Sequence, residues 1–283
     1  MSAGQPTEEP SLYGGSKKVR KVRVHHLLAA KERGEKWPML TSYDQYTASI
    51  FDQAGIPVLL VGDSASNNVY GNETSLPVTL DELIPLIRAV SRSTQRALVV
   101  GDLPFGSYEA GPEQALGSAV RMMKEGGAQA VKLEGGRRMQ RQIRAMVDAG
   151  IPVMGHVGFT PQSEHALGGY RVQGRGLSAE DIVADAHAVA EAGAFAVVLE
   201  MVMADVAKRI TAELEIPTIG IGAGADTDAQ VLVWQDMAGL RTGHLPRFVK
   251  QYADLHGALA QAATDFADEV RGGAFPAEEH TFH

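Results

Sequence analysis

The sequence predicts an α/β protein of the (β/α)8-barrel (TIM-barrel) class, preceded by one extra helix. From about residue 38 onward, short apolar runs recur about eight times, and amphipathic stretches alternate with them. The runs are apolar throughout, which is typical of parallel strands buried on both faces. The chain of 283 residues has an ordinary length for one such barrel. Repeated strand–helix alternation favours a parallel sheet with right-handed crossovers that closes on itself.

Eight apolar segments are expected to form the strands. They are residues 38–42, 57–62, 97–101, 128–134, 152–155, 194–200, 217–221 and a weaker segment near 231–234. Five amphipathic segments between them are expected to form helices, at residues 83–93, 111–125, 138–149, 179–192 and 204–214. Several of these helices end at a glycine just before the next strand, which is a common helix stop.

The ends of the chain differ from its centre. Residues 1–20 are polar and contain Gly, Pro and Ser, so we expect a disordered tail there. Residues 23–33 predict the extra helix before the barrel, and 246–270 predict one or two helices after it. No linker divides the remainder. The predicted organisation is therefore a single barrel domain over 21–270 and a C-terminal tail over 271–283.

Composition excludes several classes of function. The chain has no cysteine, which excludes disulfides, thiolate zinc sites and cysteine nucleophiles, and fits a reducing compartment such as the cytoplasm. Its 26 Lys and Arg against 34 Asp and Glu give a net charge of −8, which weighs against a nucleic-acid partner. No apolar run approaches the ~20 residues of a membrane span, so no membrane partner is expected.

Four carboxylates stand at the ends of four predicted strands: Asp63, Asp102, Glu134 and Glu200. In this architecture the catalytic side chains gather at the C-terminal ends of the strands, so these four should meet at one mouth. Crowded carboxylates repel unless a cation lies between them, and an all-oxygen set favours Mg2+. We predict that Asp63, Asp102 and Glu134 bind Mg2+, the last directly or through a water. The alternative is that each Asp only caps a helix or turn.

Three further side chains are candidates for substrate binding. Lys132 shares one strand face with Glu134, and a buried lysine needs a charged partner. It holds a substrate carboxylate or oxyanion, or else forms a structural ion pair with Glu134. Ser64 either hydrogen-bonds an anion or caps the next segment. His156 lies at the expected end of the fifth strand, where it donates to a substrate oxygen or holds a helix end.

Glu200 stands alone among apolar residues at the end of the sixth strand, a setting that suits a general base. Its alternatives are a further metal ligand or an ion-pair partner. Glycines in 220–224 permit close backbone approach, but their spacing is not that of a nucleotide-binding loop. The Gly-rich, basic segment 168–176 is a mobile lid or a surface loop.

Several motifs resemble those of the ketopantoate hydroxymethyltransferase family, in order over residues 20–265. They are TSYD at 41–44, VGDS at 61–64, GDLPF at 101–105, VKLEGG at 131–136, GHVGFTPQ at 155–162, GGY at 168–170 and GIGAG at 220–224. One departure is Ala229, where we expect Gly; we place it before the last strand. The resemblance implies a barrel of the phosphoenolpyruvate/pyruvate type, with one Mg2+ per subunit, in a cytoplasmic homodecamer.

The resemblance also implies a reaction. The family transfers a one-carbon unit from 5,10-methylenetetrahydrofolate to 3-methyl-2-oxobutanoate, which gives 2-dehydropantoate for pantothenate synthesis. Its base, which removes the C3 proton, matches Glu200. The residues that match its metal and ketoacid ligands are Asp63, Ser64, Asp102, Lys132 and Glu134. Two rival interpretations are another Mg2+-dependent 2-oxo acid lyase, mutase or aldolase on a similar barrel, and a catalytically silent barrel that acts as a scaffold.

Overall fold

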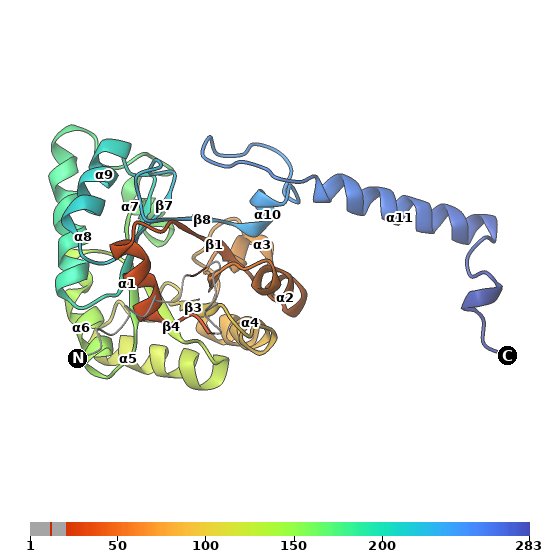
Figure 1. The fold of residues 1–283 in the computed structure, drawn as a ribbon, viewed down its shortest axis with the longest axis horizontal. Helices are drawn as coiled ribbons and strands as arrows, with labels where there is room; N and C mark the ends of the chain where they lie inside the picture. Colours follow the sequence, from red (N-terminus) through yellow and green to blue (C-terminus); the bar gives the residue numbers. More distant parts are fainter. Residues whose placement is uncertain (1–11, 13–20) are drawn as a thin grey trace, which may run out of the picture. The chain divides into compact units, whose positions relative to one another are not determined.

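The computed structural model describes Leu12 and residues 21–283. It divides the chain into two compact units, Met1–Leu232 and Val233–His283. The first unit contains a closed barrel in which eight strands follow one another in chain order (Figure 1). Every pair of neighbouring strands is parallel. The predicted fold class is therefore confirmed, because helices connect the strands of this closed parallel sheet.

All eight predicted strands are present. They are β1 (Trp37–Thr41), β2 (Val58–Val61), β3 (Leu98–Asp102), β4 (Ala130–Glu134), β5 (Val153–Gly158), β6 (Ala196–Glu200), β7 (Thr218–Ile221) and β8 (Ala229–Leu232). Most strand boundaries differ slightly from the prediction, and two of these differences affect named residues. The fifth strand continues to Gly158, so His156 lies within it. The eighth begins at Ala229, which pairs with Trp37 and does not precede the strand as expected.

Helices surround the barrel, and α6, α8 and α9 lie side by side along it (Figure 1). The helices of the first unit are α1 (Val24–Glu32), α2 (Gln45–Gln53), α3 (Ala65–Asn68), α4 (Leu80–Ser93), α5 (Pro112–Arg121), α6 (Gln140–Asp148), α7 (Glu164–Leu167), α8 (Ala179–Glu191) and α9 (Ala204–Glu213). The extra N-terminal helix is α1, as predicted. Helix α2 was not predicted; it begins at Asp44, whose carboxylate accepts hydrogen bonds from the backbone of Tyr46 and Thr47.

The second unit contains α10 (Trp234–Met237) and α11 (Leu255–Gly272). Helix α11 is a single helix where we predicted one or two over 246–270. Asp254 caps it by accepting a hydrogen bond from the backbone of Gly257. The unit boundary falls inside the predicted single domain of 21–270, so that division of the chain stays a prediction. The predicted tail over 1–20 lies outside the described residues except for Leu12, which is buried.

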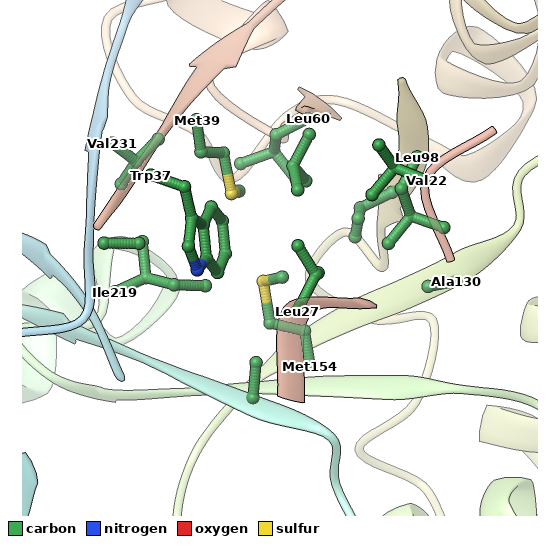
Figure 2. Packing of buried hydrophobic residues seen from close by; sticks show 14 of the residues in the cluster. Val22, Leu27, Trp37, Met39, Leu60, Leu98, Ala130, Met154, Ile219 and Val231 are labelled. Atoms are coloured by element: carbon green, nitrogen blue, oxygen red, sulfur yellow. The ribbon is translucent and has the colours of Figure 1, made fainter. Parts of the chain in front are cut away.

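The N-terminal half of the barrel is filled by apolar side chains. Trp37, Met39, Leu60 and Met154 point into the interior, and Leu27 of α1 packs against them (Figure 2). Helix α1 therefore covers the N-terminal end of the barrel with an apolar face. A packed interior of this kind is a core and not a pore, and it leaves the opposite end for chemistry.

The inward-facing positions change from apolar to polar along each strand. Side chains that share a strand face are two residues apart. On β3 the inward series is Leu98, Val100 and then Asp102, and on β6 it is Ala196, Val198 and then Glu200. The strands β4 and β5 show the same change, with series Ala130–Lys132–Glu134 and Met154–His156. Strand period alone thus places a polar layer on top of the core.

In the part of the chain that the structure describes, no helix is both long and apolar enough to cross a bilayer.

Candidate active site

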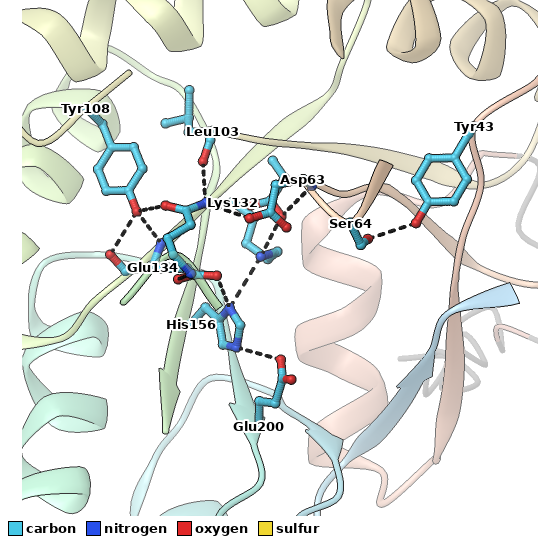
Figure 3. A network of polar contacts seen from close by, with 11 residues as sticks. Tyr43, Asp63, Ser64, Leu103, Tyr108, Lys132, Glu134, His156 and Glu200 are labelled. Atoms are coloured by element: carbon cyan, nitrogen blue, oxygen red, sulfur yellow. Dashed lines mark hydrogen bonds and ion pairs between the residues drawn. The ribbon is translucent and has the colours of Figure 1, made fainter. Parts of the chain in front are cut away.

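The polar layer brings six of the seven predicted site residues into one network at the C-terminal end of the barrel (Figure 3). The connected side chains are Asp63, Asp102, Lys132, Glu134, His156 and Glu200. Register explains part of this arrangement, because Asp102 is the β-sheet partner of Lys132, and Glu134 is the partner of His156. Ser64, the seventh, neighbours Asp63 in the chain.

Lys132 forms a buried ion pair with Asp102, and the distance from its Nζ to Asp102 Oδ2 is 2.8 Å. We had considered Glu134 as its structural partner; that alternative is wrong, because Nζ contacts the carboxylate on the neighbouring strand. Nζ also lies 3.4 Å from His156 Nδ1. A buried cation is stabilised only when an anion faces it, and Asp102 supplies that charge.

Burial and charge shift the ionisation of this pair. Burial raises the pKa of Asp102 to about 7, although the positive charge of Lys132 opposes the rise. Burial lowers the pKa of Lys132, but the charges of Asp102, Asp63 and Glu134 outweigh it and leave the pKa raised. Lys132 therefore remains a cation in the interior. Burial also raises the pKa of Glu134.

Asp63 and Glu134 are each held by one of their two carboxylate oxygens. Asp63 Oδ2 accepts a hydrogen bond of 2.9 Å from the side-chain amide of Gln162. Glu134 Oε2 accepts one of 3.0 Å from the backbone N–H of the same residue. The backbone N–H of Asp63 also donates to Asp102 Oδ2 at 3.2 Å. The three predicted metal ligands are thus neighbours within one hydrogen-bonded group.

This donor set suits a hard cation in its chemistry. Asp102 Oδ1 is buried and forms no hydrogen bond, and buried Glu134 Oε1 has only the longer 3.5 Å contact with His156 Nδ1; this is costly for carboxylate oxygens unless a further partner binds them. Among the described residues, however, no group of three or more His, Cys, Asp or Glu side chains is gathered closely enough to hold a metal ion. The carboxylates are therefore adjacent and unsatisfied, without a preformed cage.

Glu200 contacts His156, so the prediction that its carboxylate stands isolated is wrong. The distance from His156 Nε2 to Glu200 Oε2 is 3.2 Å, and His156 Nδ1 lies 3.5 Å from Glu134 Oε1 (Figure 3). Burial and the charge of Lys132 lower the pKa of His156, yet hydrogen bonding to Glu134 and Glu200 raises it overall to about 9. His156 therefore links the carboxylate cluster to Glu200.

Ser64 interacts with a residue that lies in the TSYD motif at 41–44 but was not among the predicted site residues. Its Oγ lies 2.8 Å from the hydroxyl of Tyr43, a buried side chain at the end of β1. Ser64 stands at the start of α3, but its side chain makes no capping hydrogen bond there, so the capping alternative is wrong. Burial raises the pKa of Tyr43 to about 12, so its hydroxyl stays protonated.

The segment 168–176 contacts the strand that carries Glu200. The ring of Tyr170 stacks on Phe159 with centroids 4.7 Å apart, and the backbone N–H of Gln173 donates to Met201 O at 2.7 Å. Met201, directly after Glu200, is the one non-glycine residue with positive φ (49°) among the described residues. This backbone region costs energy for a side chain with a Cβ, and such cost concentrates at functional positions.

Gly220, in the segment 220–224, approaches another part of the same chain. A Cβ on Gly220 would lie 2.7 Å from Thr227 Oγ1, so the absence of a side chain serves internal packing there.

Neither Tyr108 nor Tyr43 nor Gln162 was among the predicted site residues. Gln162 lies in a motif that we had singled out, but Tyr108 carries no distinguishing sequence signal.

Comparison with known proteins identifies close relatives over nearly the whole chain. Residues 21–278 match the family model described as ketopantoate hydroxymethyltransferase. A 3-methyl-2-oxobutanoate hydroxymethyltransferase of Saccharopolyspora erythraea is 70% identical over 280 residues, which cover 99% of this chain and 96% of that protein. One of a Nocardioides species is 68% identical over 93% of this chain and 90% of its own length.

Solved structures with a similar fold are much more distant in sequence. A phosphonopyruvate hydrolase crystallised with oxalate and Mg2+ has a TM-score of 0.59 at 14% identity, over 92% of this chain and 93% of that one. A 2,3-dimethylmalate lyase of the phosphoenolpyruvate mutase/isocitrate lyase superfamily has a TM-score of 0.56 at 16% identity, over 92% and 91% of the two chains. These similarities support the predicted barrel type, and at such identity they concern the fold alone.

Proposed function

Because the chain belongs to the ketopantoate hydroxymethyltransferase family, we propose that its barrel mouth transfers a one-carbon unit to 3-methyl-2-oxobutanoate. The chain is a one-carbon transferase of pantothenate biosynthesis, and its product is 2-dehydropantoate. The observation that carries the assignment to this site is the convergence of Asp63, Asp102, Glu134 and Glu200 at the C-terminal ends of β2, β3, β4 and β6. The rival lyase and mutase interpretations are now supported only by a similarity in fold, whereas the family match supports the transferase.

One Mg2+ per subunit is part of the proposal, with Asp63, Asp102 and Glu134 as its ligands. The support is the all-oxygen donor set and the buried Asp102 Oδ1, which forms no hydrogen bond. When bound, Mg2+ supplies Lewis-acid polarisation of the keto group. Lys132 forms an ion pair with Asp102, so its positive charge offsets part of the negative charge of the carboxylates when no cation is bound.

The ketoacid is a small anion, and the chain offers it a cation and a hydroxyl. Lys132 stays positively charged in the buried layer and orients the substrate's oxygens electrostatically. Ser64 donates its hydroxyl hydrogen to the ketoacid while its oxygen accepts the hydrogen bond from Tyr43. Tyr43 therefore restricts the direction in which Ser64 donates.

Glu200 removes the proton from C3 of the ketoacid. The methylene carbon is bonded to two folate nitrogens. One of these bonds opens to give the iminium form, and the electron pair left at C3 bonds to its carbon. The second carbon–nitrogen bond then breaks as the oxygen of water replaces the nitrogen, and the C3 proton and one water proton complete the two N–H groups of the departing tetrahydrofolate. His156 Nε2 pairs with the carboxylate of Glu200 at 3.2 Å, and this contact limits the rotation of Glu200 and aims the base at one position. His156 lies beside the ketoacid in this arrangement.

The remaining partners belong to the same proposal. The co-substrate 5,10-methylenetetrahydrofolate binds across the barrel mouth, beside the segment 168–176. The family resemblance implies that the protein forms a homodecamer in the cytoplasm. The net charge of −8 weighs against a nucleic-acid partner.

The test is hydrogen exchange at C3, followed by NMR in D2O with ketoacid and Mg2+ but no folate. We expect exchange at C3 that stops when EDTA removes the metal, and 2-dehydropantoate only when 5,10-methylenetetrahydrofolate is added. Formation of a product from the ketoacid alone would point to a lyase or mutase. Thermal stabilisation by Mg2+ and ketoacid without any exchange would point to a silent scaffold.

A further inference from the structure

Gln162 is a buried amide that contacts two of the proposed metal ligands at once. It lies in the 3-10 turn Pro161–Ser163 that follows β5. Its backbone N–H donates to Glu134 Oε2, and its side-chain Nε2 donates to Asp63 Oδ2. Nε2 also donates to Leu103 O at 3.0 Å. One residue thus joins two carboxylates that stand at the ends of strands that are not neighbours, β2 and β4.

The orientation of this amide is determined by its partners. A carboxylate and a backbone carbonyl can only accept, so the NH2 group of Gln162 has to face Asp63 and Leu103. Its Oε1 then faces Tyr108, whose hydroxyl donates to it at 2.5 Å. The Tyr108 hydroxyl also accepts from the backbone N–H of Glu134 at 3.3 Å.

We infer that Gln162, held by Tyr108, is a positioning residue that sets the separation of Asp63 and Glu134 for cation binding. It engages Asp63 Oδ2 and Glu134 Oε2, and it leaves Glu134 Oε1 with only the 3.5 Å contact to His156 Nδ1. Asp102 is already paired with Lys132. The amide of Gln162 therefore restrains the other two ligands, Asp63 and Glu134. The inference rests on the proposed metal site and adds the residues that organise it.

The experiment compares Gln162→Met, Tyr108→Phe and the double variant with the wild type in Mn2+ titrations, in which EPR reports the free ion. Gln162→Met keeps the length of the side chain and the backbone N–H to Glu134, so it removes only the amide. Loss of a hydrogen bond that supports a metal ligand typically costs about 10–100-fold in affinity, and we expect at least ~10-fold for Gln162→Met. Tyr108→Phe should weaken Mn2+ binding less, because the amide remains but can turn.

The double variant separates positioning from a general packing role. If Tyr108 acts through the amide, Tyr108→Phe has no further effect on Mn2+ affinity once Gln162 is Met, so the two effects are not additive. Tyr70→Phe is the control. It removes a tyrosine hydroxyl that donates to the backbone carbonyl of Glu82, outside the network, and should leave Mn2+ affinity unchanged. Thermal unfolding in EDTA checks that each variant is folded.

The outcomes are distinguishable. Wild-type Mn2+ affinity in Gln162→Met, or fully additive effects of the two substitutions, would overturn the positioning role while the metal site stands. If Gln162→Met fails to fold, Tyr108→Phe alone decides: unchanged Mn2+ affinity in that variant overturns the inference. A wild type that binds no Mn2+ with or without ketoacid overturns the metal site itself, and the inference with it.

Discussion

Asp102 and Lys132 are partners in the register between β3 and β4, and their side chains meet as an ion pair of 2.8 Å inside the barrel. Both are almost fully buried. One carboxylate that we assign to the metal is therefore already neutralised by a residue that we assign to the substrate. The two assignments are coupled, because a cation or an anion that enters the site changes the charge that this pair experiences.

Lys132→Met should destabilise the protein, because it leaves Asp102 buried without a counter-charge. Breaking a buried pair in this way costs on the order of 3–5 kcal/mol. The double variant Asp102→Asn, Lys132→Met removes both charges and should recover most of that loss. Thermal unfolding in EDTA measures both effects. The coupling would be contradicted if the loss of stability in the double variant equalled the sum of the losses in Lys132→Met and Asp102→Asn alone.

Asp102→Ala should weaken Mg2+ binding, measured by calorimetry, by more than the ~10–100-fold that a supporting hydrogen bond costs, because a ligand itself is lost. Asp44→Ala is a control at a carboxylate that caps α2 and lies outside the network. It should cost about 1 kcal/mol of stability and leave Mg2+ affinity unchanged. Equal Mg2+ affinity in Asp102→Ala and the wild type would remove Asp102 from the ligand set.

Glu200→Gln should abolish hydrogen exchange at C3 of the ketoacid while Mg2+ still binds. The amide keeps the shape of the side chain but accepts no proton at neutral pH, and Glu200 contacts none of the three proposed ligands directly. Glu213→Gln, on the surface of α9, is the matched control and should exchange normally. NMR in D2O gives the rates. Normal exchange in Glu200→Gln would mean that another group is the base.

Gly158→Ala should damage both stability and activity. A Cβ at this position, where φ is 95°, would lie 2.4 Å from the carbonyl oxygen of Glu200. Gly150→Ala is the control, since Gly150 has a similar φ of 83° but open space around it. The backbone penalty alone is about 1–2 kcal/mol. We expect Gly158→Ala to lower the thermal midpoint clearly more than Gly150→Ala; equal shifts would show that β5 and β6 tolerate the added methyl.

The barrel and its polar mouth could be predicted because both follow from local patterns. Continuous apolar runs indicate parallel strands, and an acid at the end of a run lies at the C-terminal end of the sheet. That reasoning placed Asp102 and Glu134 correctly at the ends of β3 and β4. It needs only the period of two along a strand and the common direction of parallel neighbours.

The pairing of the side chains could not be predicted in the same way, because it depends on how far each strand is shifted against the next. Register sets Asp102, and not Glu134, beside Lys132. It also sets Glu200 opposite Gly158, so His156 lies one inward position below and reaches up to it. Tyr108 and Gln162 lie in loops, where no periodicity indicates the direction of a side chain.

Because α1 covers the N-terminal end of the barrel, it affects how reactants and products enter and leave. Among the described residues, Leu27 and the apolar side chains packed against it fill the N-terminal end of the barrel. We therefore expect ketoacid, water and product to pass through the C-terminal end, across which we place the folate. A folate bound there blocks the exchange of the ketoacid or product beneath it. The geometry of the barrel therefore constrains the order in which reactants bind and products leave.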